Sequence, residues 1–429
     1  MRPSRLTDHR AFRSLREGNY RIFFTGHAIS VVGTWMQRVA QDWLVLSLTN
    51  SPVALGWTLT FQFLPVLAFG LWGGTIADRM DKRKLVIGTQ VAQAGLALTL
   101  GTLAGAGLVQ LWMVYLLAFF LGCVTVLDSP ARHGLVSEMV PPTDIVNAQS
   151  LSSSVHNTGR LIGPAIAGVA ISLVGISTAF ILNSLSFIPV VLALRSTDPS
   201  TLYRGDPAPR ARGQIREGLT LVWQHPRLRM TLVLVAVIAL LGQNFRVVLP
   251  ALALEIPAGG AGTYGTLMAL LGLGSVIGGL TTAWAGGTTS GWLTWTCLAF
   301  GAVCLASAFA PSLWMIFAFM VPLGLSNALF NNVARSIMQV DAGRLLRGRV
   351  ASLHAVLFLG TKPIGGPLVG WIVEKWGAWA GLAVGGVSAL TAGLLALVWL
   401  RTSNEWKEGI KEVVGQQPAA DQAVEIIDL

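Results

Sequence analysis

The chain has 429 residues, of which 53% are hydrophobic and 12% are charged, whereas an ordinary soluble domain has about 25% charged residues. This composition excludes a soluble enzyme, a disordered scaffold and a nucleic-acid-binding protein, although the formal net charge is +10. It indicates an all-α integral membrane protein, most of which lies in lipid.

Apolar segments recur along the whole chain, with the length of about 20 residues that a helix needs to cross a bilayer. The predicted spans are residues 22–47, 53–77, 85–105, 109–130, 145–174, 177–195, 230–252, 263–285, 291–310, 312–334, 348–373 and 377–400. The segments at one end of these spans together carry 25 Lys and Arg residues, and the opposite loops carry only Lys375. Because positive loops stay in the cytoplasm, we expect a multi-pass protein of the bacterial inner or plasma membrane with both termini in the cytoplasm.

The second half of the chain repeats the first. The segment LWMVYLLAFFLGC at 111–123 matches LWMIFAFMVPLGL at 313–325, and GRLIGPAIAG at 159–168 matches KPIGGPLVG at 362–370. Six spans in each repeat predict two pseudo-symmetric halves with parallel orientation, as in one large class of secondary transporters. The predicted divisions are a cytoplasmic N-terminal arm, the N-terminal half, a cytoplasmic linker, the C-terminal half and a cytoplasmic tail, at residues 1–21, 22–195, 196–229, 230–400 and 401–429.

Two motifs carry a resemblance to a known family. The loop GGTIADRMDKRK, from Gly73 to Lys84, closely resembles the loop 2–3 signature of the major facilitator superfamily. The opening stretch FRSLREGNYRIFFTGHAISVVGTWMQRVAQDWLVLSLTNSP and DSPARHGLVSEMVP from Asp128 resemble the branch that contains enterobactin exporters and macrolide efflux proteins. The resemblance implies twelve membrane helices and a secondary active transporter, most simply a proton antiporter that exports a siderophore-like or drug-like solute by alternating access.

The resemblance also implies a cytoplasmic latch that stabilises the outward-facing state. Its candidate residues are Gly74, Asp78, Arg79, Lys82, Arg83 and Asp128. Asp78 leaves the second span where it can face the N-terminus of the eleventh span near Gly348, which favours an anion. We expect Lys82 or Arg83 to connect this point to Asp128. The alternative is a solvated turn with ordinary surface charges.

Four cations lie within the predicted spans, at Arg38, Arg160, Arg246 and Lys362. An unpaired cation at the centre of a bilayer costs roughly 2.5–3.5 kcal/mol, so these side chains are expected to face the protein interior. Only Asp42 offers an obvious opposing charge at the level of Arg38 and Arg246. A net-positive cavity predicts a small-molecule substrate that is anionic or amphipathic.

The candidate substrate-binding residues are Arg160, Lys362, Arg246, Arg38, His156 and Asn157. Two alternatives stay open for the cations. Arg38 and Asp42 are spaced for an i,i+4 ion pair that braces the outer gate, and Arg160 and Lys362 can instead donate hydrogen bonds to carbonyls of neighbouring helices.

The energy source is narrowed by exclusion. The chain has no phosphate-binding loop, so transport must use an ion gradient or the membrane potential. Asp42 and His156 are the candidate proton carriers. Potential-driven anion efflux and a cationic multidrug/H⁺ antiporter that uses Asp42 are the alternatives, and a membrane enzyme or a non-transporting sensor is disfavoured. We expect a monomer in the bilayer that uses protons and a small solute, with no cofactor, metal or nucleic acid.

Glycine and proline cluster in the fifth and eleventh spans, at Gly159, Gly163, Pro164, Gly366 and Pro367. Small residues let membrane helices approach closely. These positions are therefore expected to be sites of tight helix packing.

Overall fold

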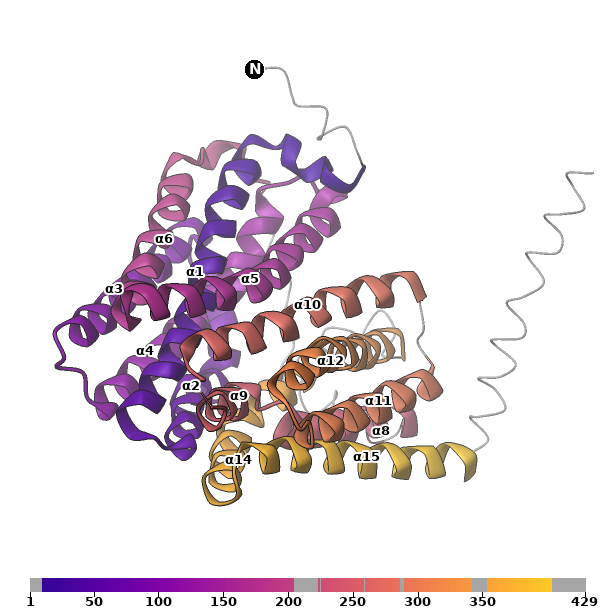
Figure 1. Cartoon of the computed structure of the whole chain (residues 1–429). Helices are drawn as coiled ribbons and strands as arrows, with labels where there is room; N and C mark the ends of the chain where they lie inside the picture. The colour runs from indigo at the N-terminus through magenta and orange to yellow at the C-terminus, as the bar shows by residue number, and fades with distance from the viewer. Residues whose placement is uncertain are drawn as a thin grey trace, which may run out of the picture.

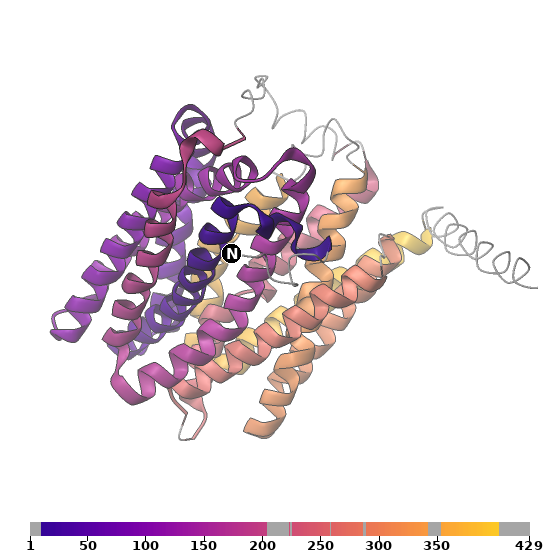
Figure 2. The same ribbon diagram turned by 90° about the horizontal axis from the view of Figure 1, so that it is seen from above.

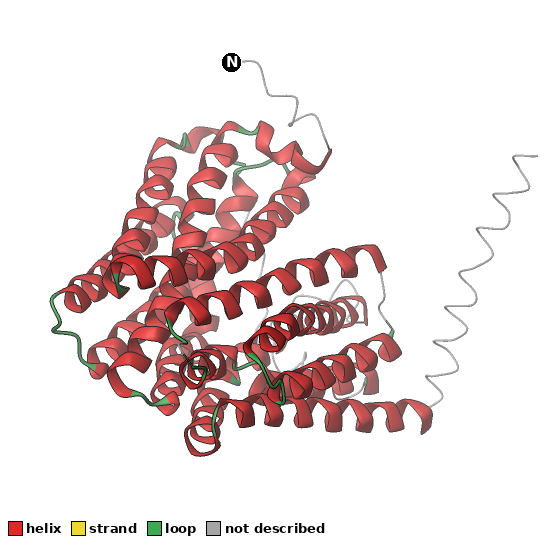
Figure 3. Ribbon diagram, viewed as in Figure 1, coloured by secondary structure: helices red, strands yellow, loops and turns green. Residues whose placement is uncertain are grey.

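The computed structural model describes residues 10–203, 223, 225–257, 259–285, 289–341 and 353–402. Within these ranges the regular structure is entirely helical, as Figures 1 and 3 show. Most of the predicted linker at 196–229 and of the tail at 401–429 lies outside the described residues.

The N-terminal half contains six long helices, preceded by the short 3₁₀ helix η2 (Arg10–Arg16). They are α1 (Gly18–Thr49), α2 (Pro52–Arg79), α3 (Lys82–Gly105), α4 (Leu111–Glu138), α5 (Ile145–Val174) and α6 (Ile176–Ser196). The short 3₁₀ helices η3 (Pro142–Asp144) and η4 (Pro199–Thr201) lie before α5 and after α6. The side chain of Arg13 in η2 forms an ion pair with Asp144, at 2.5 Å between Nη2 and Oδ1.

The C-terminal half repeats this order, but its first span is broken into three helices. Its elements are α8 (Pro226–Val237), the π-helix η5 (Ile238–Gly242), α9 (Phe245–Glu255), α10 (Ala261–Ala285), α11 (Ser290–Ala308), α12 (Leu313–Asp341), a helix over 353–360, α14 (Lys362–Trp376) and α15 (Ala378–Thr402). Figure 2 shows the two halves largely side by side, with the first coloured indigo to magenta and the second coloured salmon to yellow.

The helices confirm the twelve-span membrane fold. Eleven segments of the described chain are long and apolar enough to cross a membrane. The twelfth span is α1, a 32-residue helix whose polar residues lower its hydropathy. Among these polar residues, Gln37, Gln41 and Asp42 are buried inside the protein, so this polar face of α1 is shielded from lipid by its neighbours.

The repeat is visible in the backbone as well as in the sequence. Gly175 joins α5 to α6 with φ 99° and ψ 166°, and Gly377 joins α14 to α15 with φ 90° and ψ 166°. This region of backbone space is essentially restricted to glycine. The two halves therefore make the same turn with the same residue, 202 positions apart (377 − 175).

The apolar core shows where the halves meet. We call the end of the bundle that contains the start of α1 and the end of α15 the termini side, and the opposite end the far side. One large buried cluster includes residues of both halves, for example Leu44 of α1 and Leu252 of α9. Toward the termini side the core divides into one cluster within the N-terminal half and a second within the C-terminal half. In the described residues, the halves thus share a core on the far side and diverge toward the termini side, as Figure 1 shows.

Two helix pairs form most of this shared contact, namely α2 with α14 and α5 with α10. Glycines lie at both crossings. A Cβ atom at Gly366 would come within 2.9 Å of the carbonyl oxygen of Gly56, and a Cβ atom at Gly265 within 2.6 Å of the carbonyl oxygen of Pro164. Side chains at these positions would separate the helices, since the approach is backbone to backbone.

Replacing Gly366 with valine is therefore expected to weaken far-side closure. Overpacking of this kind costs about 1–3 kcal/mol. The change can be followed as the rate of maleimide labelling of Thr60→Cys in a variant without the native cysteines, because Thr60 is buried and donates a hydrogen bond of 2.8 Å to the carbonyl of Pro363. The labelling rate should rise. Gly95→Val is the matched control, since a Cβ atom there meets nothing within 4 Å, and equal rates for both variants would contradict the prediction.

Candidate functional site

A buried ion pair joins the two halves on the far side. Nε and Nη2 of Arg246 in α9 donate to the two carboxylate oxygens of Asp42 in α1, at 2.8 and 2.7 Å. The hydroxyl of Tyr264 in α10 donates to Oδ2 of Asp42 at 2.8 Å, and Gln62 in α2 accepts from Nη1 of Arg246 at 3.1 Å. The side chain of Asp42 is 2% exposed and that of Arg246 is 15% exposed. We call Asp42, Gln62, Arg246 and Tyr264 the far-side gate.

The i,i+4 ion pair between Arg38 and Asp42, considered above as an alternative, is not formed among the described residues. Asp42 instead forms a bidentate pair with the guanidinium of Arg246, and two parallel hydrogen bonds are stronger than a single contact. The guanidinium of Arg38 lies over the ring of Trp35, with Cζ 4.3 Å from the ring centroid. Within the described residues, Arg38 has no carboxylate partner. Arg246, a predicted substrate-binding residue, is instead engaged in the far-side gate in this arrangement.

A second polar contact lies at the rim of the far side. Ser51 caps the N-terminus of α2, where its hydroxyl accepts from the amide of Ala54 at 3.3 Å. The same hydroxyl donates to the carboxylate of Glu374 in α14. The rim therefore connects α2 and α14 beyond their glycine crossing.

Lys362 at the start of α14 is bound to the break in the first span of the second half. Its ammonium donates to the carbonyl oxygens of Gln243 and Ala239, at 2.7 and 3.3 Å. The π-helix and the two residues after it leave carbonyls without helical partners, and backbone groups inside a membrane protein need such partners. This is the carbonyl contact considered above as an alternative, so Lys362 is not a free cavity cation in this structure.

Arg160 in α5 is differently placed. Its Cζ atom lies 5.9 Å from the ring centroid of Trp35, and the described residues provide no acceptor or carboxylate for it. Arg38 and Arg160 both lie near the ring of Trp35, whereas Arg246 is paired with Asp42 and Lys362 is bound to backbone carbonyls. We call these four residues of the membrane spans the cationic cluster.

His156 and Asn157 lie one turn before Arg160. The His156 ring is stacked near that of His27, with centroids 6.5 Å apart, and Nε2 of His27 lies 3.4 Å from Nη1 of Arg132. His156 therefore lies beside a polar group of the N-terminal half that contains His27 and Arg132. Asn157 is exposed.

The predicted latch through Asp128 is not formed. Lys82 pairs with Glu138 in α4, and Arg83 donates to the backbone carbonyls of Leu194 and Arg195. Asp128 is satisfied within its own half, where it accepts from Thr89, Gln90 and Arg132 at 2.7, 2.8 and 3.2 Å.

Among the described residues, the hydrogen bonds and ion pairs of Lys82, Arg83 and Asp128 all lie within the N-terminal half. The predicted contact point of Asp78 near Gly348 lies outside the described residues. Gly74, Asp78 and Arg79 form the last part of α2.

The glycines of α5 pack against Trp35. A Cβ atom at Gly163 would lie 2.5 Å from Cβ of Trp35, and one at Gly159 would lie 2.6 Å from Val31. Pro164 and Pro367 lie inside α5 and α14 at the helix crossings described above. This packing fixes the indole near the guanidinium groups of Arg38 and Arg160, which have no carboxylate partner among the described residues.

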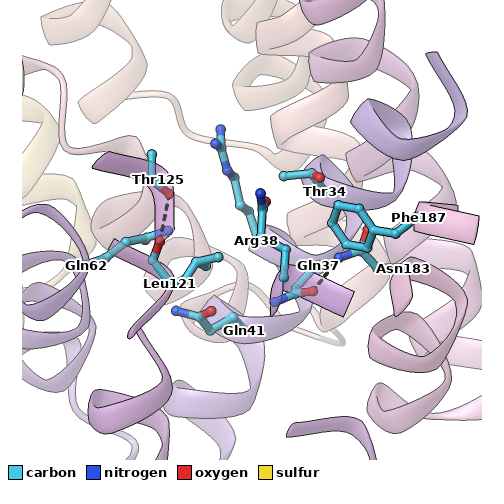
Figure 4. Close-up of a pocket in the computed structure, with 10 residues that line it drawn as sticks. Thr34, Gln37, Arg38, Gln41, Gln62, Leu121, Thr125, Asn183 and Phe187 are labelled. Carbon is cyan, nitrogen blue, oxygen red and sulfur yellow. Dashed lines mark hydrogen bonds between the residues drawn. The ribbon is translucent and has the colours of Figure 1, made fainter. Parts of the chain in front are cut away.

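A small pocket lies inside the N-terminal half beside the cationic cluster (Figure 4). Its lining is mostly neutral and polar and consists of Thr34, Gln37, Arg38, Gln41, Gln62, Gln93, Leu121, Thr125, Asn183 and Phe187. One wall is held by a hydrogen bond between Asn183 and Gln37. The pocket includes a gate residue, Gln62, and a cluster residue, Arg38.

Sequence reasoning missed several residues of this site, namely Trp35, Gln41, Gln62 and Tyr264. Gln62 and Tyr264 lie outside the motifs quoted above, and Trp35 and Gln41 lie within the opening stretch but are not marked there as site residues. The four-residue spacing of Gln37 and Gln41 beside Arg38 and Asp42 was the one available signal, because a polar helix face inside a membrane needs an interior partner.

Comparison with known proteins agrees with this architecture. A family model described as transmembrane secretion effector matches residues 9–423. The chain belongs to the major facilitator superfamily. It is a multi-pass membrane transporter rather than an enzyme, and its bacterial relatives indicate the plasma membrane.

The relatives include exporters. The chain is 23% identical to the enterobactin exporter EntS of Citrobacter koseri, across 92% of this chain and 93% of that protein. It is 26% identical to macrolide efflux protein A of Streptococcus pyogenes, across 35% of this chain and 37% of that protein. Other curated relatives are also matched over less than half of their length. Among solved structures, a bacterial homologue of the human lysosomal transporter Spinster, in its inward-facing and occupied conformation, has the same fold, with a TM-score of 0.72, 13% identity and coverage of 90% of this chain and 97% of that one.

Proposed function

We propose that this transporter exports a small organic anion or anionic amphipath, siderophore-like or drug-like, across the bacterial plasma membrane. The single observation that supports an anion is the charge of the central site. Arg38 and Arg160 lie near the ring of Trp35 without a carboxylate partner in the described residues, whereas Arg246 is paired with Asp42. These two unpaired positive charges attract an anionic solute and repel a cationic one.

The direction of transport follows from the orientation that we propose. The termini side carries nearly all of the loop Lys and Arg residues, and this asymmetry supports its assignment to the cytoplasm. The far side, which is closed by the gate and the glycine crossings, then faces outward. In this arrangement the halves diverge toward the cytoplasm, which is the state in which an exporter loads its substrate. The exporter relatives support this direction.

Proton antiport is the proposed energy source, with Asp42 as the coupling residue. A protonated Asp42 would no longer hold the charge of Arg246, so the far-side gate would release. Loss of the gate allows the outer ends of the halves to separate. His156 is the second candidate, since it lies between Arg160 and the polar group around Arg132.

Uptake into everted membrane vesicles tests the proposal. Energised vesicles should accumulate anions from a panel of aliphatic and aromatic carboxylates and catecholates, and should not accumulate lipophilic cationic dyes. An uncoupler that abolishes uptake while a potassium-diffusion potential is maintained supports proton drive, and uptake that persists under that potential indicates potential-driven efflux. Accumulation of the cationic dyes alone would overturn the proposal and favour a multidrug antiporter based on Asp42.

A further inference from the structure

The pocket of Figure 4 contains hydrogen-bond donors that the protein leaves without acceptors. Gln41 is 3% exposed, and its Nε2 atom has no hydrogen-bond partner in the structure. Arg38 lines the same pocket and has no acceptor among the described residues. An unsatisfied buried donor costs about 1–3 kcal/mol, and an unpaired buried charge costs more.

Two amide oxygens of the pocket are already engaged. The carbonyl oxygen of Gln37 is taken by the amide of Asn183, and that of Gln62 by Arg246. The lining contains no carboxylate. Because the lining combines the cation of Arg38 with the unpartnered amide N–H₂ group of Gln41, the chemistry of this pocket favours an acceptor that also carries negative charge.

Size restricts the occupant further. The pocket offers about 50 Å³, and one water molecule needs at least about 10–15 Å³ measured in this way. That space holds a group of a few heavy atoms rather than a whole organic solute. A water molecule would satisfy Nε2 of Gln41, but it would leave the charge of Arg38 without a counterion.

We propose that this pocket is a subsite for a carboxylate group of the transported solute, bound between Arg38 and Gln41. One carboxylate oxygen accepts from the guanidinium and the other from Nε2 of Gln41, while the body of the solute lies outside the pocket near Arg160. The inference rests on the proposed function and narrows it. It requires a substrate whose carboxylate is joined to the rest of the molecule through a narrow segment.

Binding of butyrate and of its neutral analogue butyramide to the purified full-length protein tests this subsite. Both can be titrated at constant ionic strength by saturation-transfer NMR. Butyrate should bind the unmodified protein at least tenfold more tightly than butyramide. Arg38→Gln and Gln41→Met should each weaken butyrate binding by tenfold or more and leave butyramide binding nearly unchanged.

A third variant distinguishes loss of the binding subsite from loss of folding. Gln41→Glu keeps the size of the side chain and places a carboxylate beside Arg38, so it should abolish butyrate binding while the thermal unfolding midpoint stays the same or rises. Arg21→Gln and Gln110→Met are matched controls on exposed positions and should bind butyrate as the unmodified protein does.

The outcomes separate the subsite from the general proposal. Butyrate binding that survives Arg38→Gln and Gln41→Met but is lost in Arg160→Gln would overturn the subsite and leave an anion transporter. Equal binding of butyrate and butyramide by the unmodified protein would also overturn the subsite. The proposal of an anion exporter is tested separately, since uptake of cationic dyes alone by the everted vesicles would contradict it.

Discussion

Replacing Asp42 with asparagine is expected to shift the transporter out of its far-side-closed state. The substitution leaves the buried guanidinium of Arg246 without a charge partner, and removal of one member of a buried ion pair costs about 3–5 kcal/mol. At about 1.4 kcal/mol per tenfold, the closed state should become less populated by roughly two to three orders of magnitude relative to the far-side-open state, in which water reaches Arg246.

Distances between spin labels on the two halves measure this shift. Ala106 and Ser312 lie in exposed far-side loops of the first and second half, so labels at these positions report the separation of the outer ends. In a variant without the native cysteines, Asp42→Asn should lengthen the distance distribution, and Arg246→Gln should do the same.

The exchanged pair provides the control. Asp42→Arg combined with Arg246→Asp restores opposite charges across the same interface and should recover part of the short distance. If both single variants keep the short distance of the unmodified protein, then the ion pair does not hold the far side closed.

Replacing Arg160 with glutamine should reduce anion export by about one to two orders of magnitude. Hydrogen bonds to charged groups contribute about 1.5–3 kcal/mol, and Arg160 has no protein acceptor in the described residues, so its loss removes substrate contacts without breaking an internal bond. The measurement is the initial rate of anion uptake by everted vesicles, normalised to the amount of protein in the membrane. Arg21→Gln is the control, since it removes one positive charge from an exposed position of α1.

Lys362→Gln should behave differently from Arg160→Gln. The ammonium of Lys362 holds the carbonyls of Gln243 and Ala239, so its loss should lower thermal stability as well as transport. If anion uptake is unchanged in Arg160→Gln, then Arg160 does not belong to the transport site.

The membrane fold could be predicted from the sequence because its signals are local or periodic. Apolar length gives the spans, the distribution of Lys and Arg gives their alternation, and the offset between Gly163-Pro164 and Gly366-Pro367 gives the repeat. Such features do not depend on which helices pack together. The first span, predicted at 22–47 among the apolar segments, corresponds to α1, although its polar residues lower its hydropathy.

The partners of the charged residues could not be predicted in the same way. Spacing on one helix favours Arg38 as the partner of Asp42, yet the structure joins Asp42 to Arg246, which is 204 residues away along the chain. That choice depends on which faces of α1 and α9 meet when the far side closes. The role of Lys362 likewise depends on a helix break at 238–244. The sequence IALLGQN contains no proline that would predict this break.

The state of the transporter also decides which contacts exist. The loop signature predicts a latch between Asp128 and Lys82 or Arg83, whereas the described structure pairs Lys82 with Glu138 and leaves Asp128 in its own half. A sequence that encodes two alternating arrangements contains charges for both of them. Each arrangement uses only its own set, so one structure confirms only part of what the sequence suggests.

The sign of the charge moved during transport tests the central claim most directly. Purified transporter can be reconstituted in proteoliposomes, and the current can be recorded when an anion that the vesicles accumulate is added to the termini side. Export of an anion moves negative charge toward the far side, and a proton that moves toward the termini side adds to the same current. The account therefore predicts a net movement of positive charge toward the termini side. This current should grow with a termini-side-negative potential and should be lost in Arg160→Gln. A current of opposite sign, or electroneutral transport, would contradict it.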